Sequence, residues 1–151
     1  MSEATKARQA ALAAELRALY GYALVGPRLD SAGQALARSC IAAHEQLRDA
    51  LTATIEAARG VPLATRPDYP DLYPVTDLAT ARTRAVDLEH TCASAWRYLY
   101  AELAAPGPAT GSSTRDRASA QRALTACAVR ATRWRLQAHA AFPTVAFPGI
   151  D

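Results

Sequence analysis

The chain has 151 residues, of which half are hydrophobic, and its formal net charge is +3. This length suits one domain (1–151) with a sizeable core, and the apolar share excludes a disordered polyampholyte. Alanine makes up about a quarter of the chain whereas phenylalanine occurs twice, which favours helices over a large β-sheet.

Apolar residues at helical spacing predict two helices in the first part of the chain. The first runs from about Glu3 to Val25, with Ser2 as its N-cap. The second begins after a cap at Asp30 or Ser31 and ends near Gly60, which is expected at the C′ position. The residues of "GPRLD" break the pattern between them.

Two further helices are predicted in the second part. The third begins after Thr76 and runs to about Ala104, and the fourth spans roughly Thr114 to Ala140. The stretch "APGPATGSS" is predicted to form the turn between them. The ending "AFPTVAFPGID" is expected to form an extended strap on the bundle, because exposed phenylalanine is unusual.

Four helices of similar length, each with one apolar stripe, predict an all-α four-helix bundle. The segment "VPLATRPDYPDLYPV" between the second and third helices contains four prolines and can reach roughly 45 Å. A helix of about 28 residues is about 42 Å long, so this segment can cross the whole bundle. One long crossover between two helical hairpins is the ferritin-like arrangement, and the alternative is a surface loop on an up-down bundle.

Three polar residues lie on or beside the apolar stripes at a similar height. Glu15, His44 and Glu89 each fall about 12 or 13 residues into their own helix, so they are expected to meet near the middle of the bundle. Two carboxylates and one histidine from three helices form part of a carboxylate-bridged di-iron site.

The chain also resembles a known family over nearly its whole length. The strings "AAELRALYGYALVG", "AAHEQLRDAL", "YPVTDLATARTRAVDLE", "AVRATRWR" and "AFPG" are similar to those of the actinobacterial ferritin-like domain of unknown function. The resemblance implies a ferritin-like bundle and implies no established activity.

The ligand set for two irons is incomplete. Such a site takes a Glu-x-x-His pair from each of two helices, but Ile41 stands three residues before His44, and the matching string on the fourth helix is "CAVR". Glu89 therefore needs another counter-charge, for which Arg130 is the first candidate and Arg48 the second. We expect a buried salt-bridge cluster of these residues with Glu15 and His44, without catalytic residues and without a metal.

Two alternatives stay open at this point. Glu15 and Glu89 could lie at the helix margins and reach solvent. Glu15, His44 and Glu89 could instead hold a single divalent metal ion, since three protein ligands suffice for one zinc. The sequence leaves undecided whether the protein is an enzyme.

The expected function is accordingly a non-catalytic structural or interaction module. The alternative is an iron-, manganese- or zinc-dependent oxidative or hydrolytic enzyme that uses Glu15, His44 and Glu89. The partner expected is a second copy in a dimer, with no membrane and no nucleic acid involved, because the charge is small and no basic face carries aromatic residues. A small-molecule ligand cannot be identified from the sequence.

The three cysteines and the N-terminus indicate the cellular compartment of the protein. Cys40, Cys92 and Cys127 form no C-x-x-C pair, and each falls on an apolar helix face, as buried reduced thiols do. The N-terminus lacks the apolar run of a signal peptide, and no stretch has the length of a membrane span. We therefore expect a cytoplasmic protein.

Overall fold

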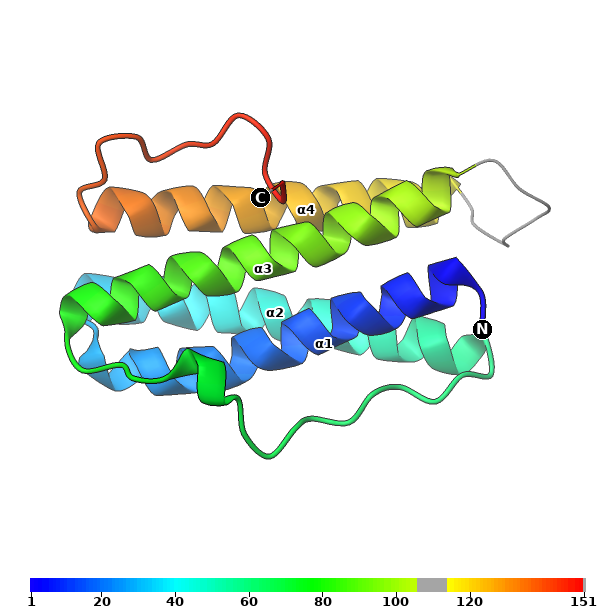
Figure 1. Ribbon diagram of the computed structural model, residues 1–151, viewed down its shortest axis with the longest axis horizontal. Coiled ribbons are helices and arrows are strands. Elements are labelled where there is room, and N and C mark those ends of the chain that lie inside the picture. The colour runs from blue at the N-terminus through cyan, green and yellow to red at the C-terminus, as the bar shows by residue number, and fades with distance from the viewer. Residues whose placement is uncertain (106–113, 151) are drawn as a thin grey trace.

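The computed structural model describes residues 1–105 and 114–150, and these residues form helices and no strand (Figure 1). Four long helices make up the fold: α1 Glu3–Val25, α2 Ser31–Ala57, α3 Leu78–Ala104 and α4 Thr114–Gln137. Two short 3-10 turns, η1 Gly26–Arg28 and η2 Pro70–Leu72, lie in the connections. The predicted all-α four-helix bundle is confirmed. Most of the predicted turn "APGPATGSS" falls on 106–113, outside the described residues.

The helices begin where side chains can satisfy their first backbone N–H groups. The side chains of Ser2, Asp30 and Asp77 accept hydrogen bonds from the backbone N–H groups three residues further on. At Asp77 the cap is reciprocal, because the Thr80 side chain accepts the backbone N–H of Asp77 at 3.0 Å. These caps explain why the sequence located the helix starts well.

The helix ends differ from the prediction in two places. The left-handed residue that ends α2 is Arg59, with φ of 59°, rather than Gly60. The Gly60 N–H then reaches back to the Ile55 carbonyl at 2.9 Å, as in a Schellman motif. Helix α4 ends at Gln137, three residues earlier than predicted, and His139 takes the left-handed conformation with φ of 56°. Neither Arg59 nor His139 is a glycine, which is the residue type that indicates a helix end in a sequence.

The change Arg59→Gly is expected to raise the free energy of unfolding by about 0.5–1 kcal/mol. Glycine adopts a positive φ without the clash between Cβ and the carbonyl oxygen that an L-residue suffers, and this gain exceeds the added freedom of the unfolded chain. Urea unfolding of the two proteins measures the effect. Arg59→Ala, which keeps Cβ, should show no gain, and equal stabilisation by both changes would contradict this explanation.

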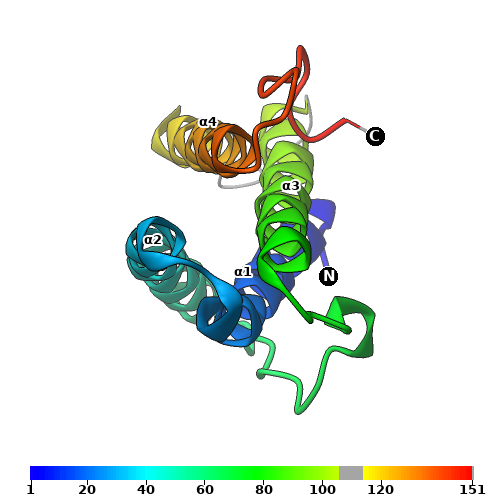
Figure 2. The ribbon, with the colours of Figure 1, turned by 90° about the vertical axis from the view of Figure 1, so that its left-hand side faces the viewer.

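The long connection crosses the bundle from end to end (Figure 1). Helix α2 ends beside the N-terminus, whereas α3 begins at the opposite end, and residues 58–77 run back along α1. The predicted end-to-end crossover is therefore confirmed, and the alternative of a surface loop on an up-down bundle is wrong. Seen along the bundle axis, α1 lies between α2 and α3, and α4 lies beside α3 (Figure 2).

Helices α1 and α3 approach closely because of one glycine. A Cβ on Gly21 would lie 2.5 Å from the Leu88 side chain. This close approach brings α1 near Glu89, the residue that follows Leu88. None of the described helices is long and apolar enough to cross a membrane.

The C-terminal segment lies on the bundle, but its phenylalanines do not. A Cβ on Gly149, whose φ is 77°, would lie 2.8 Å from the Ala93 carbonyl oxygen, so the backbone touches α3 there. Phe142 is 87% exposed and Phe147 is 71% exposed. The strap is where the sequence predicted it, but the expectation that its phenylalanines would be covered is wrong. Backbone contact at a glycine, rather than aromatic burial, holds this segment against α3.

Candidate functional site

A cluster of charged side chains occupies the middle of the bundle. Glu15, His44 and Glu89 are 0% exposed and Arg130 is 8% exposed, although long charged side chains are almost never buried unless they are paired. We call these four residues the buried polar cluster. They come one each from α1, α2, α3 and α4.

The His44 imidazole joins the two carboxylates. Its Nδ1 lies 2.6 Å from Glu15 Oε2, and its Nε2 lies 3.1 Å from Glu89 Oε1. Burial alone disfavours the imidazolium, but the hydrogen bonds to Glu15 and Glu89 outweigh it and raise the pKa of His44 to about 9. At neutral pH both ring nitrogens therefore carry a proton and donate to a carboxylate.

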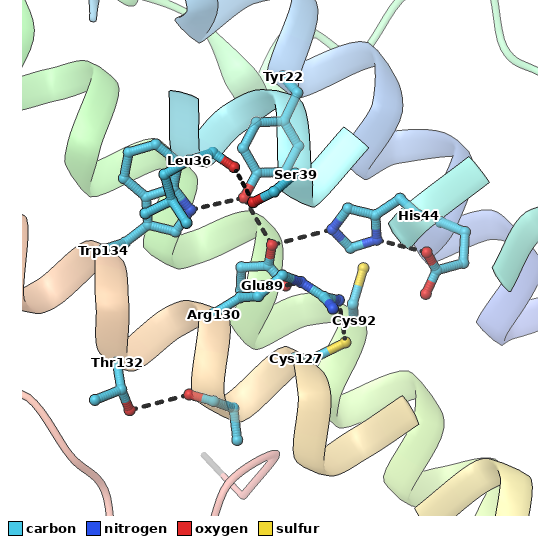
Figure 3. A network of polar contacts seen from close by, with 12 residues as sticks. Tyr22, Leu36, Ser39, His44, Glu89, Cys92, Cys127, Arg130, Thr132 and Trp134 are labelled. Atoms are coloured by element: carbon cyan, nitrogen blue, oxygen red, sulfur yellow. Dashed lines mark hydrogen bonds and ion pairs between the residues drawn. The ribbon is translucent and has the colours of Figure 1, made fainter. Parts of the chain in front are cut away.

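Arg130 supplies the second positive charge. Its Nε donates to Glu89 Oε2 at 2.9 Å (Figure 3), and its Nη2 lies 3.2 Å from Cys127 Sγ. Burial by itself would raise the pKa of Glu89, but the hydrogen bond and charge of His44, with the charge of Arg130, hold it below its usual value. With two carboxylates and two cations, the cluster is electrically neutral.

Aromatic side chains complete the hydrogen bonding of both carboxylates. Trp96 Nε1 donates to Glu15 Oε1 at 2.6 Å, and the Tyr22 hydroxyl donates to Glu89 Oε1 at 2.7 Å. The Tyr22 oxygen in turn accepts the Trp134 Nε1–H at 2.8 Å (Figure 3). Every carboxylate oxygen of the cluster thus accepts at least one hydrogen bond, which is the condition under which buried charges are tolerated.

The structure brings four of the five predicted residues together and leaves the fifth outside. Arg48, named from the sequence as a second partner of Glu89, lies at the surface of α2, where its Nε donates to Asp49 at 2.8 Å. Its side chain is 34% exposed, so this candidate is wrong. Lying four residues after His44 was not enough, because Arg48 is beyond the edge of the buried face of α2.

Three hydrogen-bonding partners were not assigned to the cluster from the sequence. Tyr22 lies seven residues after Glu15, Trp96 lies seven after Glu89, and Trp134 lies four after Arg130. Each spacing places the aromatic ring one or two turns away on the same helix face. That register is the sequence signal that could have identified them.

The thiols of Cys40 and Cys92 lie beside the cluster and stay protonated. Burial, followed by the charge of Glu89, raises the pKa of Cys40 to about 11. A hydrogen bond with Cys127, followed by burial, raises the pKa of Cys92 well above its ordinary value. All three cysteines are free and buried, and the raised pKa makes the Cys40 and Cys92 thiols poor nucleophiles at neutral pH.

The donor set does not fit a pair of iron ions. Ile41 replaces the carboxylate that would precede His44, and on α4 the position expected to supply a ligand carries Arg130, a cation that points at Glu89. One smaller metal-like grouping is present: ligand atoms of Glu15, His44 and Cys92 all lie within 4.8 Å of one another. It includes Cys92 rather than the Glu89 named from the sequence.

Two of three comparisons with known proteins found a match to this chain. The structure is similar to the crystal structure of a conserved hypothetical protein from Mycobacterium tuberculosis, with a TM-score of 0.82, 29% sequence identity and 97% of each chain covered. No curated protein matches the chain. The family described as "Domain of unknown function (DUF4439)" matches residues 7–151, and because this is nearly the whole chain, the protein belongs to that family.

Proposed function

We propose that the protein is a ferritin-like bundle in which an internal salt-bridge network takes the place of a di-iron centre, and that it works as a non-catalytic structural or interaction module. The bond between Arg130 Nε and Glu89 Oε2 at 2.9 Å carries this proposal. A fixed guanidinium at that carboxylate supplies the positive charge that metal ions supply in carboxylate-bridged bundles. The end-to-end crossover supports the ferritin-like assignment, since that topology has one such connection.

The surface supports the interaction part of the proposal. Six exposed apolar side chains lie on the second half of α4 and the segment after it: Val129, Leu136, Phe142, Val145, Phe147 and Ile150. Large apolar side chains left exposed along one segment favour a protein contact there. We propose a second copy of the chain as the partner, in a cytoplasmic dimer whose thiols stay reduced, and sedimentation equilibrium measures the association.

Metal analysis tests the absence of a resident metal. Protein purified without chelator or affinity tag is expected to hold well under one equivalent of iron, manganese or zinc, because the network already neutralises both carboxylates. Plasma emission spectroscopy on the native protein gives the stoichiometry. One equivalent of metal that is lost in His44→Ala would overturn the proposal.

A second candidate function rests on the grouping of Glu15, His44 and Cys92. A thiolate, an imidazole and a carboxylate are a donor set that suits Zn²⁺, and a metal-dependent hydrolytic or oxidative enzyme would use such an ion. This candidate predicts that bound metal disappears in Cys92→Ser and persists in Cys40→Ser, a matched buried thiol outside the grouping. Metal retained in Cys92→Ser but lost in Glu89→Gln would instead favour the ligand set named from the sequence.

A further inference from the structure

The crossover is hydrogen-bonded to α1 at three places, namely Gln9, Arg17 and Tyr20. Near its start, the Gln9 side chain donates to the Val61 carbonyl at 2.7 Å and accepts the Leu63 N–H at 3.0 Å. Two turns further along α1, Arg17 Nη2 donates to Asp71 at 2.7 Å. Between the Gln9 and Arg17 anchors the backbone of the connection bows outward (Figure 2), while the Tyr20 and Tyr69 rings pack with their centres 5.1 Å apart.

A pocket of about 500 Å³ lies under this arch. Its floor consists of small side chains from α1 and α3, mainly Ala10, Ala13, Ala14 and Ala95. Alanine leaves unfilled the space that a leucine would occupy, so an apolar cavity remains between the helices and the crossover. This volume is within the range of small-molecule sites, which are mostly apolar with a few polar groups that orient the ligand.

Of the two arginines that line the pocket, one has no carboxylate partner among the described residues. Arg17 is already bound by Asp71 and by Asp87, at 2.7 and 3.0 Å, and Asp68 accepts the Tyr20 hydroxyl at 2.8 Å. Arg66 also lines the pocket, with its guanidinium carbon 5.4 Å from the centre of the Tyr69 ring. No carboxylate among the described residues forms an ion pair with Arg66. Three carboxylates and two guanidiniums lie at the pocket, so it is Arg66 itself, and not a net positive charge, that can receive a negative head group.

We propose that this pocket binds an amphipathic anion, namely a single-chain carboxylate whose apolar tail covers the alanine floor and whose head group meets Arg66. The Tyr69 side chain is 4% exposed, so it provides a fixed platform that orients the Arg66 guanidinium. This site is separate from the buried polar cluster, and the proposal does not depend on the function proposed above.

Titration calorimetry with octanoate, decanoate and dodecanoate below their micellar concentrations tests the proposal. We expect saturable binding of one molecule per chain, with affinity rising up to about fourfold for each added methylene. Decanoate should bind more tightly than decanol or decyltrimethylammonium, which have the same tail without a negative head. Equal or tighter binding of the cationic amphiphile would overturn the assignment of the head group.

Matched variants locate the site. Ala13→Phe fills the floor of the pocket and should abolish binding, whereas Ala53→Phe, at an exposed position of α2, should leave it unchanged. If Ala13→Phe does not fold, Ala10→Phe makes the same test at another alanine that lines the pocket. Arg66→Gln should weaken decanoate binding about fivefold and Arg59→Gln should not. Binding that survives the phenylalanine changes in the pocket would overturn the proposal.

A further experiment distinguishes a free single-chain carboxylate from a membrane lipid as the ligand. Vesicles of anionic phosphatidylglycerol offer the same combination of acyl chain and negative head, but in a bilayer. A pocket between the helices and the crossover predicts that the protein does not co-sediment with these vesicles while it still binds decanoate. Co-sedimentation that is the same for wild type and Ala13→Phe would show adsorption to a lipid surface and would contradict a ligand pocket.

Discussion

Replacing Arg130 by methionine is expected to lower the free energy of unfolding by about 3–5 kcal/mol at neutral pH. Methionine keeps much of the aliphatic length, so little of this loss comes from a cavity. The cost arises because Glu89, which is 0% exposed, loses the cation that donates to its Oε2. The cluster would then hold two carboxylates against the single charge of His44.

A double-mutant cycle with Glu89→Gln separates pairing from packing. The double variant retains one negative charge on Glu15 and one positive charge on His44, and glutamine can still accept the Tyr22 hydroxyl. We therefore expect the double variant to be destabilised by clearly less than the sum of the two single changes, with a coupling of about 1–3 kcal/mol. Additive losses in urea unfolding would show that the two residues are not energetic partners.

Arg133→Met is the matched control, because Arg133 lies on the same helix three residues away and is exposed. Surface substitutions of this kind usually change stability by no more than about 0.5 kcal/mol. A large loss in this control would indicate that removing any arginine from α4 weakens the helix. Pairing with Glu89 would then not explain the result for Arg130.

Raising the pH from 6.5 to above 9 is expected to remove about 3 kcal/mol of stability from the metal-free protein. Folding raises the pKa of His44 from its ordinary value of 6.5 to about 9, and one unit of pKa corresponds to about 1.4 kcal/mol. Because the folded-state pKa is the higher one, this stabilisation is complete below pH 6.5. It is lost progressively as pH rises through 9.

Urea unfolding at several pH values between 6 and 9.5, on wild type and on His44→Asn, measures this contribution. Cys40 also opposes folding at high pH, because burial keeps its thiol protonated, but it does so equally in both proteins. The difference between the two curves therefore isolates His44. Two parallel curves would mean that His44 does not titrate between Glu15 and Glu89 in the way its hydrogen bonds indicate.

The helices and their order could be predicted because their signals are local. Caps at Ser2, Asp30 and Asp77 locate three helix starts, and four prolines between residues 61 and 75 indicate a connection long enough to cross the bundle. The helix ends at Arg59 and His139 were missed because the left-handed residues there are not glycine.

The candidate site could be predicted in part for the same reason. Helical spacing located Glu15, His44, Glu89 and Arg130 on inward faces, and the cost of burying a carboxylate implied a cation beside Glu89. Spacing along one helix could not show that Arg48 reaches only Asp49 at the surface. It also could not show that Tyr22, Trp96 and Trp134 complete the hydrogen bonding, because those contacts depend on how far apart the helices lie.

By itself, the sequence determined the all-α class, the helix starts, the crossover and the need for a buried counter-charge, since each follows from neighbours along one chain segment. The packing of the helices sets which donor meets which carboxylate oxygen, places Cys92 near Glu15 and His44, and leaves a pocket between the crossover and the alanines. These features depend on distances between helices. Such distances are set by small residues, such as Gly21 against Leu88, that carry no periodic signal of their own.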